Sequence, residues 1–294
     1  MQLKRWSAAC AFACVFTCVS ACVSAWVGNS TAANAAEVAI PSPAGTMRAF
    51  WFEADPAIAK AKAPVVISLH GCGGAYSPSG ALNLSSTEDS QRFAPLGVHV
   101  LVLDGFTHRG ATSICAIATA NRSITEETRR TDLQSAFEWL AAQSNVNIKK
   151  IILLGRSHGA QTVLAALDQQ FMQSSPIAPI AAIAFYPGCT KYLRQSRYRV
   201  GAPLLLMIGE LDDWTPAFPC SQLAASAGSH NATITFEQFP DSYHGFDSTS
   251  PVHTRSNVGN TRSGTATVGG NAQARLLANT KILQWVKEIA ATQD

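Results

Sequence analysis

The sequence predicts an α/β fold in which a mostly parallel, doubly wound sheet carries helices on both faces. Short apolar segments alternate with amphipathic helical segments, as is typical of such sheets. Of the 294 residues, 47% are hydrophobic and 14% are charged, a composition that suits a globular protein with a sizeable core. We find no internal repeat and no change of composition that would mark a second domain. One domain is therefore expected over residues 36–294.

The predicted strands are short runs rich in aliphatic and aromatic residues. They are Met47–Glu53, Pro64–His70, Val98–Leu103, residues 149–154, Ile177–Phe185, Pro203–Ile208 and Thr233–Phe239. Chemistry in such sheets gathers at the carboxyl ends of the strands, so the residues that follow these runs are the candidates for a functional site.

The predicted helices separate these strands. Thr125–Ala142 is the clearest, because Leu133, Phe137 and Leu140 recur at helical spacing behind an acidic first turn. The others are residues 86–95, the stretch from Ala160 to about Phe171, and Ala272–Ala290, with Leu276, Ile282, Val286 and Ile289 on one side. Residues 247–270 are rich in Gly, Ser, Thr and Asn, which predicts a surface loop.

The first 35 residues have the features of a secretory signal peptide. Lys4 and Arg5 precede an uncharged stretch over residues 6–27, and small residues before Ala36 provide a cleavage site. Two alternatives remain open: the stretch could stay as a membrane anchor, or Cys22 could be the lipidated cysteine of a lipoprotein. Cleavage would predict a periplasmic or extracellular protein without stable membrane association, whereas either alternative would tie it to a membrane.

Charge argues against a nucleic-acid partner. The full chain has 22 Lys and Arg and 19 Asp and Glu. The first 35 residues, here called the leader, contain two of the basic residues and no acidic ones. The remainder is close to neutral and has no basic stripe, so we expect it to bind a small molecule and not a nucleic acid.

Four cysteines lie in the leader and four follow it, an even number in a chain expected to be exported. Three pairings are possible; we favour Cys72–Cys115 and Cys189–Cys220, because each closes a loop within one neighbourhood. Four free buried thiols are the alternative. No C-x-x-C pair and no histidines at zinc spacing occur, so we expect neither a metal nor another cofactor.

Ser157 is the candidate nucleophile. It lies in Gly155-Arg156-Ser157-His158-Gly159, between an apolar strand and a helix. This setting is that of a nucleophile elbow, a sharp turn that exposes the serine oxygen above the sheet edge. The pentapeptide alone is equally consistent with an ordinary βα turn in which the serine caps the helix. The residues at the other strand ends must distinguish this turn from a nucleophile elbow.

Acidic and histidine residues follow two later strands in a suggestive order. Asp212 and Asp213 come after Pro203–Ile208, and His244 comes after Thr233–Phe239. The order Ser, Asp, His is that of an α/β-hydrolase triad. His244 would be the base, and Asp212 would orient it, with Asp213 as the open alternative. The non-catalytic alternatives are that His244 is a solvated histidine and that residues 212–216 only cap the following helix.

An oxyanion hole is expected from backbone N–H groups of Cys72 and His158, provided that the Gly-rich turn at residues 70–74 faces the elbow. Trp214, Tyr243 and Phe246 flank the proposed site and are candidates to line its pocket. Other polar residues receive structural interpretations. These are a turn-shaping role for His70, a site or structural acid at Asp104, and ion pairs for Arg109, Arg129 and Arg130.

Together these motifs resemble the dienelactone hydrolase family of the α/β-hydrolase fold. The matching pieces are His70-Gly71-Cys72-Gly73-Gly74, the elbow, Gly209-Glu210-Leu211-Asp212-Asp213 and Tyr243-His244-Gly245-Phe246. The resemblance spans most of residues 45–290. It implies hydrolysis of an ester or lactone, and it implies that Cys189 and Cys220 lie near each other.

One departure from the family matters for the substrate. The enzymes that give the family its name use a cysteine nucleophile, whereas position 157 is serine. We therefore expect a secreted serine carboxylesterase that works through an acyl-enzyme on a soluble ester. The alternatives are a peptidase or acyltransferase with the same triad, and a non-catalytic binding protein of the same fold.

Overall fold

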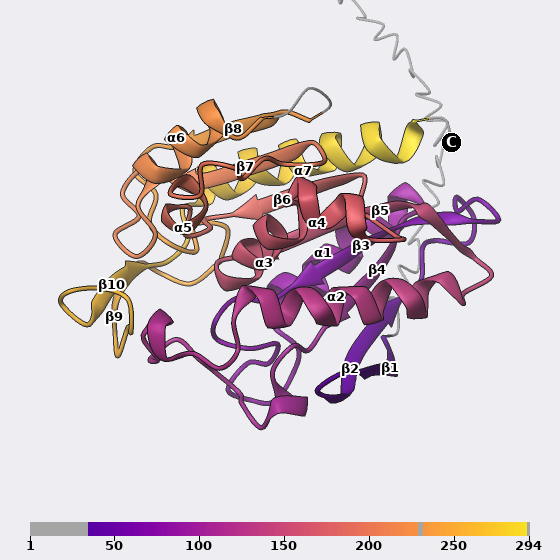
Figure 1. Ribbon diagram of the computed structural model, residues 1–294, viewed down its shortest axis with the longest axis horizontal. Coiled ribbons are helices and arrows are strands. Elements are labelled where there is room, and N and C mark those ends of the chain that lie inside the picture. Colours follow the sequence, from indigo (N-terminus) through magenta and orange to yellow (C-terminus); the bar gives the residue numbers. More distant parts are fainter. Residues whose placement is uncertain (1–34, 229–231, 293–294) are drawn as a thin grey trace, which may run out of the picture. The chain divides into compact units, whose positions relative to one another are not determined.

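Eight strands form the central sheet of the computed structural model, which describes residues 35–228 and 232–292 (Figure 1). In chain order the strands are β1 (Ala36–Ser42), β2 (Gly45–Phe52), β3 (Ala63–Leu69), β4 (His99–Leu103), β5 (Val146–Arg156), β6 (Ala181–Phe185), β7 (Leu204–Gly209) and β8 (Ile234–Phe239). Their order across the sheet is β1-β2-β4-β3-β5-β6-β7-β8. The expected α/β-hydrolase architecture is therefore present.

The sheet is parallel except at one edge. β1 and β2 form an antiparallel hairpin, and β2 pairs antiparallel with β4. From β4 to β8 every neighbouring pair is parallel. The inner strands β3, β4, β6 and β7 are buried along their whole length. Helices cover both faces of this part of the sheet, which is why these strands read as continuous apolar runs.

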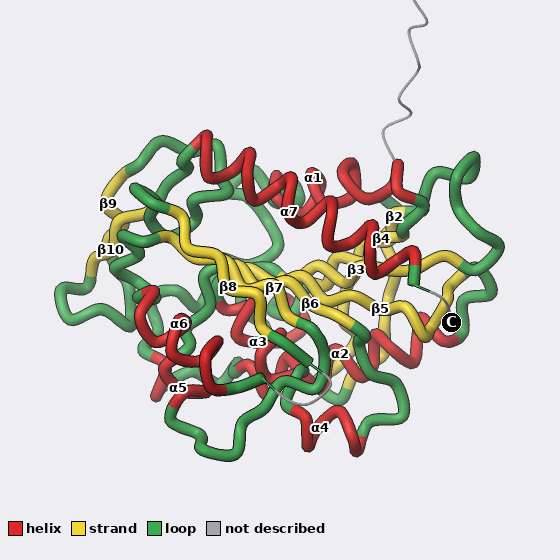
Figure 2. The backbone as a smooth tube through the Cα atoms, turned by 90° about the horizontal axis from the view of Figure 1, so that it is seen from above, coloured by secondary structure: helices red, strands yellow, loops and turns green. Residues whose placement is uncertain are grey.

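Helices form a layer on each face of the sheet (Figure 2). One layer contains α1 (Leu84–Phe93) and α7 (Ala272–Ala291). The other contains α2 (Glu126–Ala141), α3 (His158–Ala166), α4 (Gln169–Ser174), α5 (Thr190–Leu193) and α6 (Ala217–Ser226). The short 3-10 helices in the described part of the chain are η1 (Ala94–Leu96), η2 (Thr107–Arg109) and η3 (Thr119–Asn121).

Helix α2 shows how local sequence sets an element. Thr125 caps its N-terminus in a capping box with Thr128, and two glutamates occupy the first turn. Leu133, Phe137 and Leu140 are all buried, as their spacing predicts. The helix thus packs one face on the sheet and brings Arg129 into the interior, 1% exposed.

The structure corrects several sequence-based boundaries. Strand β1 was not predicted, and the helix expected to reach Phe171 is interrupted, because Asp168 caps a separate helix α4. In α7, Leu276 is 67% exposed, and the buried face consists of Ala274, Ala278, Ile282 and Val286. Two of these four residues are alanines, so a prediction based on large apolar residues wrongly assigned Leu276 to the buried face of α7.

Residues 247–270 are not merely a loop. They contain an antiparallel hairpin of β9 (His253–Ser256) and β10 (Thr265–Val268), which lies outside the main sheet (Figure 1). The four residues of β9 are exposed and those of β10 are half-buried around Ala266, and the two segments carry few large apolar residues, so no apolar alternation predicts strands here.

The predictions for the leader lie outside the described residues. These are the signal peptide at residues 1–35, lipidation at Cys22 and an anchor at residues 6–27. Among the residues that the structure does describe, no helix is both long and apolar enough to cross a membrane.

His99, at the start of β4, makes folding sensitive to acid. Its Nδ1 accepts a hydrogen bond from Ala54 N at 2.9 Å, its Nε2 faces Asn145 O at 3.3 Å, and its ring stacks on Trp51. Burial lowers the pKa of His99, since the charged ring would lose its hydration. In the unfolded chain the imidazole of His99 binds a proton near pH 6.5, whereas in the folded chain it binds one only at lower pH. The free energy of unfolding therefore falls as the pH drops below 6.5.

We therefore predict that His99→Gln flattens the pH dependence of the free energy of unfolding between pH 6.5 and 5. The slope should decrease by up to about 1.4 kcal/mol per pH unit, the effect of one proton. Urea unfolding at several pH values measures it. His253→Gln, at an exposed position, is the control and should leave the slope unchanged. An equal slope in His99→Gln and the parent would contradict the prediction.

Candidate active site

Ser157 sits on a strained turn between β5 and α3, with φ 52° and ψ −116°. The two glycines of the pentapeptide allow this turn. A Cβ at Gly155 would lie 2.4 Å from the carbonyl carbon of Gly159, and one at Gly159 would lie 2.2 Å from Leu69 O. The backbone after Ser157 therefore packs directly against the end of β3, which leaves the serine side chain partly exposed at the sheet edge.

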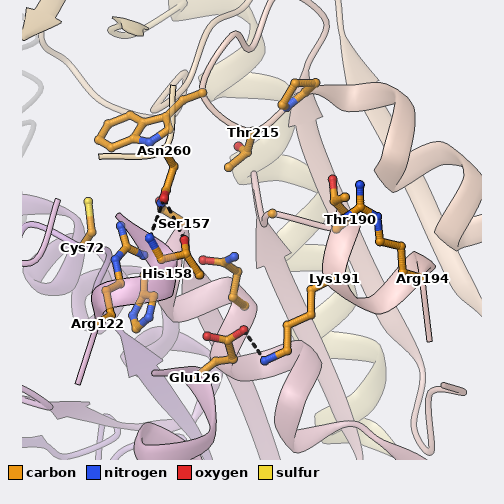
Figure 3. A pocket seen from close by; sticks show the side chains of 16 residues that line it. Cys72, Arg122, Glu126, Ser157, His158, Thr190, Lys191, Arg194, Thr215 and Asn260 are labelled. Atoms are coloured by element: carbon orange, nitrogen blue, oxygen red, sulfur yellow. Dashed lines mark hydrogen bonds and ion pairs between the residues drawn. The ribbon is translucent and has the colours of Figure 1, made fainter. Parts of the chain in front are cut away.

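The Gly-rich turn after β3 faces this elbow. A Cβ at Gly71 would lie 3.4 Å from the Cβ of Ser157, and both Cys72 and His158 line a cavity next to the serine (Figure 3). His158 is the first residue of α3, so its N–H has no partner within the helix and lies at the positive end of the helix dipole. The two backbone N–H groups expected for an oxyanion hole thus come from adjacent segments.

The structure brings Ser157, His244 and Asp212 together in one hydrogen-bonded chain. His244 Nδ1 is 2.9 Å from Asp212 Oδ2, and His244 Nε2 is 3.0 Å from Ser157 Oγ. An ionised carboxylate only accepts hydrogen bonds, so Nδ1 carries the ring proton and Nε2 accepts from the serine hydroxyl. This is the geometry in which the imidazole can take the serine proton.

The structure also separates the two candidate aspartates. Asp212 is 4% exposed and accepts hydrogen bonds from Trp214 N, Thr215 N and Thr215 Oγ1 as well as from the imidazole. It therefore orders the loop before α6 and orients the histidine. Asp213 instead accepts from Thr267 N and Thr267 Oγ1, which fastens strand β10 beside the site.

Two aromatic rings hold the imidazole of His244. Trp214 lies 4.7 Å from it and Tyr186 lies 4.6 Å from it, measured between ring centroids. Tyr186 has φ 41°, an uncommon value for a side chain of this size. The buried ring is therefore placed by a strained backbone just beyond β6.

Of the three residues expected to line the pocket, only Trp214 borders the cavities next to Ser157. Trp214 lines the cavities on both sides of Ser157. Phe246 was placed there wrongly: it is fully buried and packs on Phe185, Tyr186 and Phe239 in the core. Tyr243 lines neither cavity. Residues 243 and 246 flank the histidine in sequence, but the sharp loop around it turns their side chains away.

Both disulfides border the site. Cys72 pairs with Cys115 and Cys189 pairs with Cys220, with Cα–Cα distances of 4.9 and 5.0 Å. The first ties the turn after β3 to the loop that follows η2, and the second ties the segment after β6 to α6. Cys72 and Cys189 both line the cavity beside Ser157, so each bridge braces a wall of that cavity.

His70, Asp104 and Arg109, interpreted as structural from the sequence, all make contacts from the loops around the site. His70 accepts from Gly105 N through Nε2 and contacts Gly71 O through Nδ1, and burial lowers its pKa to about 3. Asp104 caps the turn at Phe106 and Thr107. Arg109 makes the expected ion pair, with two hydrogen bonds to Asp132.

Arg129 and Arg130 differ from the expectation of ion pairs. Arg130 donates to Ala165 O and stacks over Phe171. Arg129 donates to His70 O and contacts the ring of His158. The buried carboxylates of α2 have other partners, because Asp132 binds Arg109 and Glu126 binds Lys191.

A scan against family models decides the family. The model of the dienelactone hydrolase family matches residues 48–290, which is most of the chain. The chain belongs to the dienelactone hydrolase family. No curated protein matches it.

Solved structures with this fold include a putative dienelactone hydrolase from Klebsiella pneumoniae, with 16% identity and a TM-score of 0.59 over 86% of this chain and 98% of that chain. A dienelactone hydrolase-like promiscuous phosphotriesterase from metagenomic libraries has 18% identity and a TM-score of 0.59, covering 87% and 98% of the two chains. The acylaminoacyl peptidase of Pyrococcus horikoshii has 15% identity and a TM-score of 0.60, covering 89% of this chain and 42% of that one. At these identities the likeness concerns the fold.

Two cavities flank Ser157 in this dienelactone hydrolase family member. The first, of about 370 Å³, is lined by Arg122, Lys191 and Arg194 among others; Figure 3 shows Arg122 beside Cys72, and Lys191 and Arg194 on the opposite side. The second, of about 350 Å³, lies on the side of His244 and is lined partly by the hairpin. Among residues 35–228 and 232–292, no group of three or more His, Cys, Asp or Glu could hold a metal ion.

A buried ionic network beneath the elbow was not foreseen. Arg156 donates two hydrogen bonds to Asp89 and one to Asp247, and Tyr186 Oη donates to Asp247 at 2.7 Å. Asp247 lies three residues after His244, so the network joins the elbow to the histidine loop. The only signal in the sequence was an arginine inside the pentapeptide, and no local pattern indicates that its partners come from residues 89 and 247.

We predict that Gly159→Ala destabilises the protein by about 3 kcal/mol or more, because the added Cβ would overlap Leu69 O and His70 O, which are backbone atoms. Urea unfolding measures the change. Gly73→Ala is the matched control in the neighbouring turn, where a Cβ would meet nothing within 4 Å, and it should change stability by less than about 0.5 kcal/mol. Equal stabilities of the two variants would show that the elbow is not packed as described.

Proposed function

We propose that this protein is a secreted serine hydrolase that cleaves a carboxylic ester or lactone through an acyl-enzyme. The observation that supports it most is the hydrogen-bonded chain from Asp212 through His244 to Ser157, with Cys72 and His158 lining the cavity beside the serine. Membership of the dienelactone hydrolase family agrees with hydrolysis. The two disulfides support export to an oxidising compartment.

In the proposed reaction, His244 Nε2 removes the proton of Ser157 as Oγ attacks the carbonyl carbon. The negative charge on the tetrahedral oxygen is stabilised by the N–H groups of Cys72 and His158. Asp212 stabilises the imidazolium, which then gives its proton to the leaving alcohol. Water enters on the side of the departed alcohol, and His244 removes its proton as the water oxygen attacks the acyl carbon. The bond between that carbon and Ser157 Oγ then breaks, the imidazolium returns the proton to Oγ, and the acid is released.

The two cavities suggest how the ester lies. Because His244 must protonate the leaving oxygen, the alcohol belongs in the cavity of about 350 Å³ that this histidine lines. The acyl group then occupies the cavity of about 370 Å³. Trp214 lines both and would separate them.

We predict that a fluorophosphonate probe labels Ser157 and that Ser157→Ala lowers kcat for a short aryl ester by at least about 10³-fold. Intact-mass and peptide mass spectrometry locate the label, and comparison of aryl esters with matched anilides separates an esterase from a peptidase. Ser226→Ala, at a surface serine of α6, is the control. Unchanged turnover in Ser157→Ala would refute the proposal. Ligand binding by a protein without turnover would identify a binding protein.

The charge of the acyl cavity gives a prediction about the substrate. Lys191 is paired with Glu126 and Glu127, whereas Arg122 donates through Nε to the carbonyl oxygen of Ile117. An acyl group that ends in a carboxylate should therefore be preferred over its neutral methyl ester. Arg122→Gln should reduce that preference about fivefold to tenfold, with Arg197→Gln, at an exposed residue, as the control. Equal kcat/KM ratios in both variants would contradict the prediction.

A further inference from the structure

Arg129 is the largest side chain that is almost fully buried among the described residues, with 1% exposed. Burial lowers its pKa to about 10, and Asp132, one turn along α2, is engaged by Arg109. Taking a guanidinium out of water is costly unless it is hydrogen-bonded in compensation. The Nη2 of Arg129 is buried without a hydrogen-bond partner among the described residues, and the contacts made by its Nη1 lead to the two segments proposed to form the oxyanion hole.

The first contact fixes the turn after β3. Arg129 Nη1 donates to His70 O at 2.9 Å. In the next peptide unit, Gly71 O lies 2.8 Å from His70 Nδ1, which carries the ring proton because Nε2 accepts from Gly105 N. That peptide is trans, so its N–H, which belongs to Cys72, points away from the carbonyl held by His70.

The second contact fixes the elbow. The same nitrogen, Arg129 Nη1, is 3.1 Å from His158 Nδ1. A guanidinium only donates hydrogen bonds, so Nδ1 accepts and the ring of His158 is the neutral Nε2–H tautomer. Burial and the charge of Arg129 hold the pKa of His158 well below its usual value, which agrees with that assignment. The backbone N–H of this residue is the second proposed oxyanion donor.

Packing holds the guanidinium itself in place. Arg129 Cζ lies 5.2 Å from the centroid of the Phe106 ring, and a Cβ at Gly105 would lie 2.9 Å from Arg129 Nε. The terminal NH₂ group has two hydrogens in one plane, which suits one bond to the turn and one to the elbow. A lysine has no planar fork with which to span both acceptors.

We propose that Arg129 is a positioning residue that sets the separation of the Cys72 and His158 N–H groups, and so makes the oxyanion hole. The proposal rests on the proposed serine-hydrolase function. Arg129 does not touch the substrate; its single Nη1 nitrogen ties two segments that are 88 residues apart in the chain, His70 and His158. Loss of this tie should weaken binding of the transition state more than binding of the ester.

The experiment compares Arg129→Gln and Arg129→Lys with Arg130→Gln, whose side chain contacts neither segment. Thermal unfolding first establishes that each variant is folded. We expect kcat/KM for an aryl ester to fall about 10- to 100-fold in Arg129→Gln, mostly in kcat, and to fall less in Arg129→Lys. Arg130→Gln should stay within about twofold of the parent.

Two inhibitors distinguish a loss of oxyanion-donor positioning from a general disruption of the active site. A trifluoromethyl ketone adds Ser157 to give an oxyanion, whereas the matching methyl ketone binds largely as the ketone. The inhibition constant of the first should rise by the same factor as kcat/KM falls, and that of the second should stay within about twofold. Equal shifts for both inhibitors, or a folded Arg129→Gln with unchanged kcat/KM, would overturn the proposal.

His158→Phe provides a second variant should Arg129→Gln not fold. It removes only the contact with the elbow and leaves the bond to His70 O, so the trifluoromethyl ketone should again be the inhibitor that weakens. Selective weakening supports the proposal, and its absence refutes it. A parent protein that neither hydrolyses esters nor is labelled at Ser157 would refute the hydrolase function and this proposal together. An active parent with unaffected Arg129 variants would refute this proposal alone.

Discussion

The close approach of the elbow to the end of β3 is the constraint on which the site depends. Gly159 lies so near Leu69 O that no side chain fits between them. This contact puts the start of α3 next to the turn at residues 70–74, and Cys72 and His158 therefore line the same cavity as Ser157. The strained φ of Ser157 is maintained by packing on both sides, as expected where a fold over-determines a local conformation.

Ionic and aromatic contacts extend this constraint to the histidine loop. Arg156, the residue before Ser157, is bound to Asp89 of α1 and to Asp247, three residues after His244. Tyr186 hydrogen-bonds to Asp247 and packs its ring on the imidazole. The loops that carry the serine and the histidine are thus joined below the sheet edge by buried charges and above it through the hydrogen bond between their side chains.

Much of this arrangement follows from local sequence. Apolar runs followed by Ser157, Asp212 and His244 predicted the sheet and the meeting of these side chains, because parallel strands end at one edge. The contacts of Arg129 and Arg156 could not be predicted, since they depend on which distant carbonyl or carboxylate packing brings near. Phe246 and Leu276 were misplaced for a related reason: periodicity and proximity in sequence do not fix the direction of a side chain once a loop turns or alanines fill a helix face.

The hairpin of β9 and β10 contributes to the site without belonging to the sheet. Arg255 lies over the Trp214 ring, Gly259 N donates to Cys115 O, and Asn260 accepts from Thr119. Its attachments therefore reach the rim of both cavities, and Val268 of β10 forms an isolated parallel bridge with His244, although neither strand joins the main sheet. A change of length in the turn between these strands is therefore expected to reshape the rim of both cavities and to leave the main sheet intact. The rim of the cavities and the strands of the main sheet are in this way encoded in separable stretches of the polypeptide.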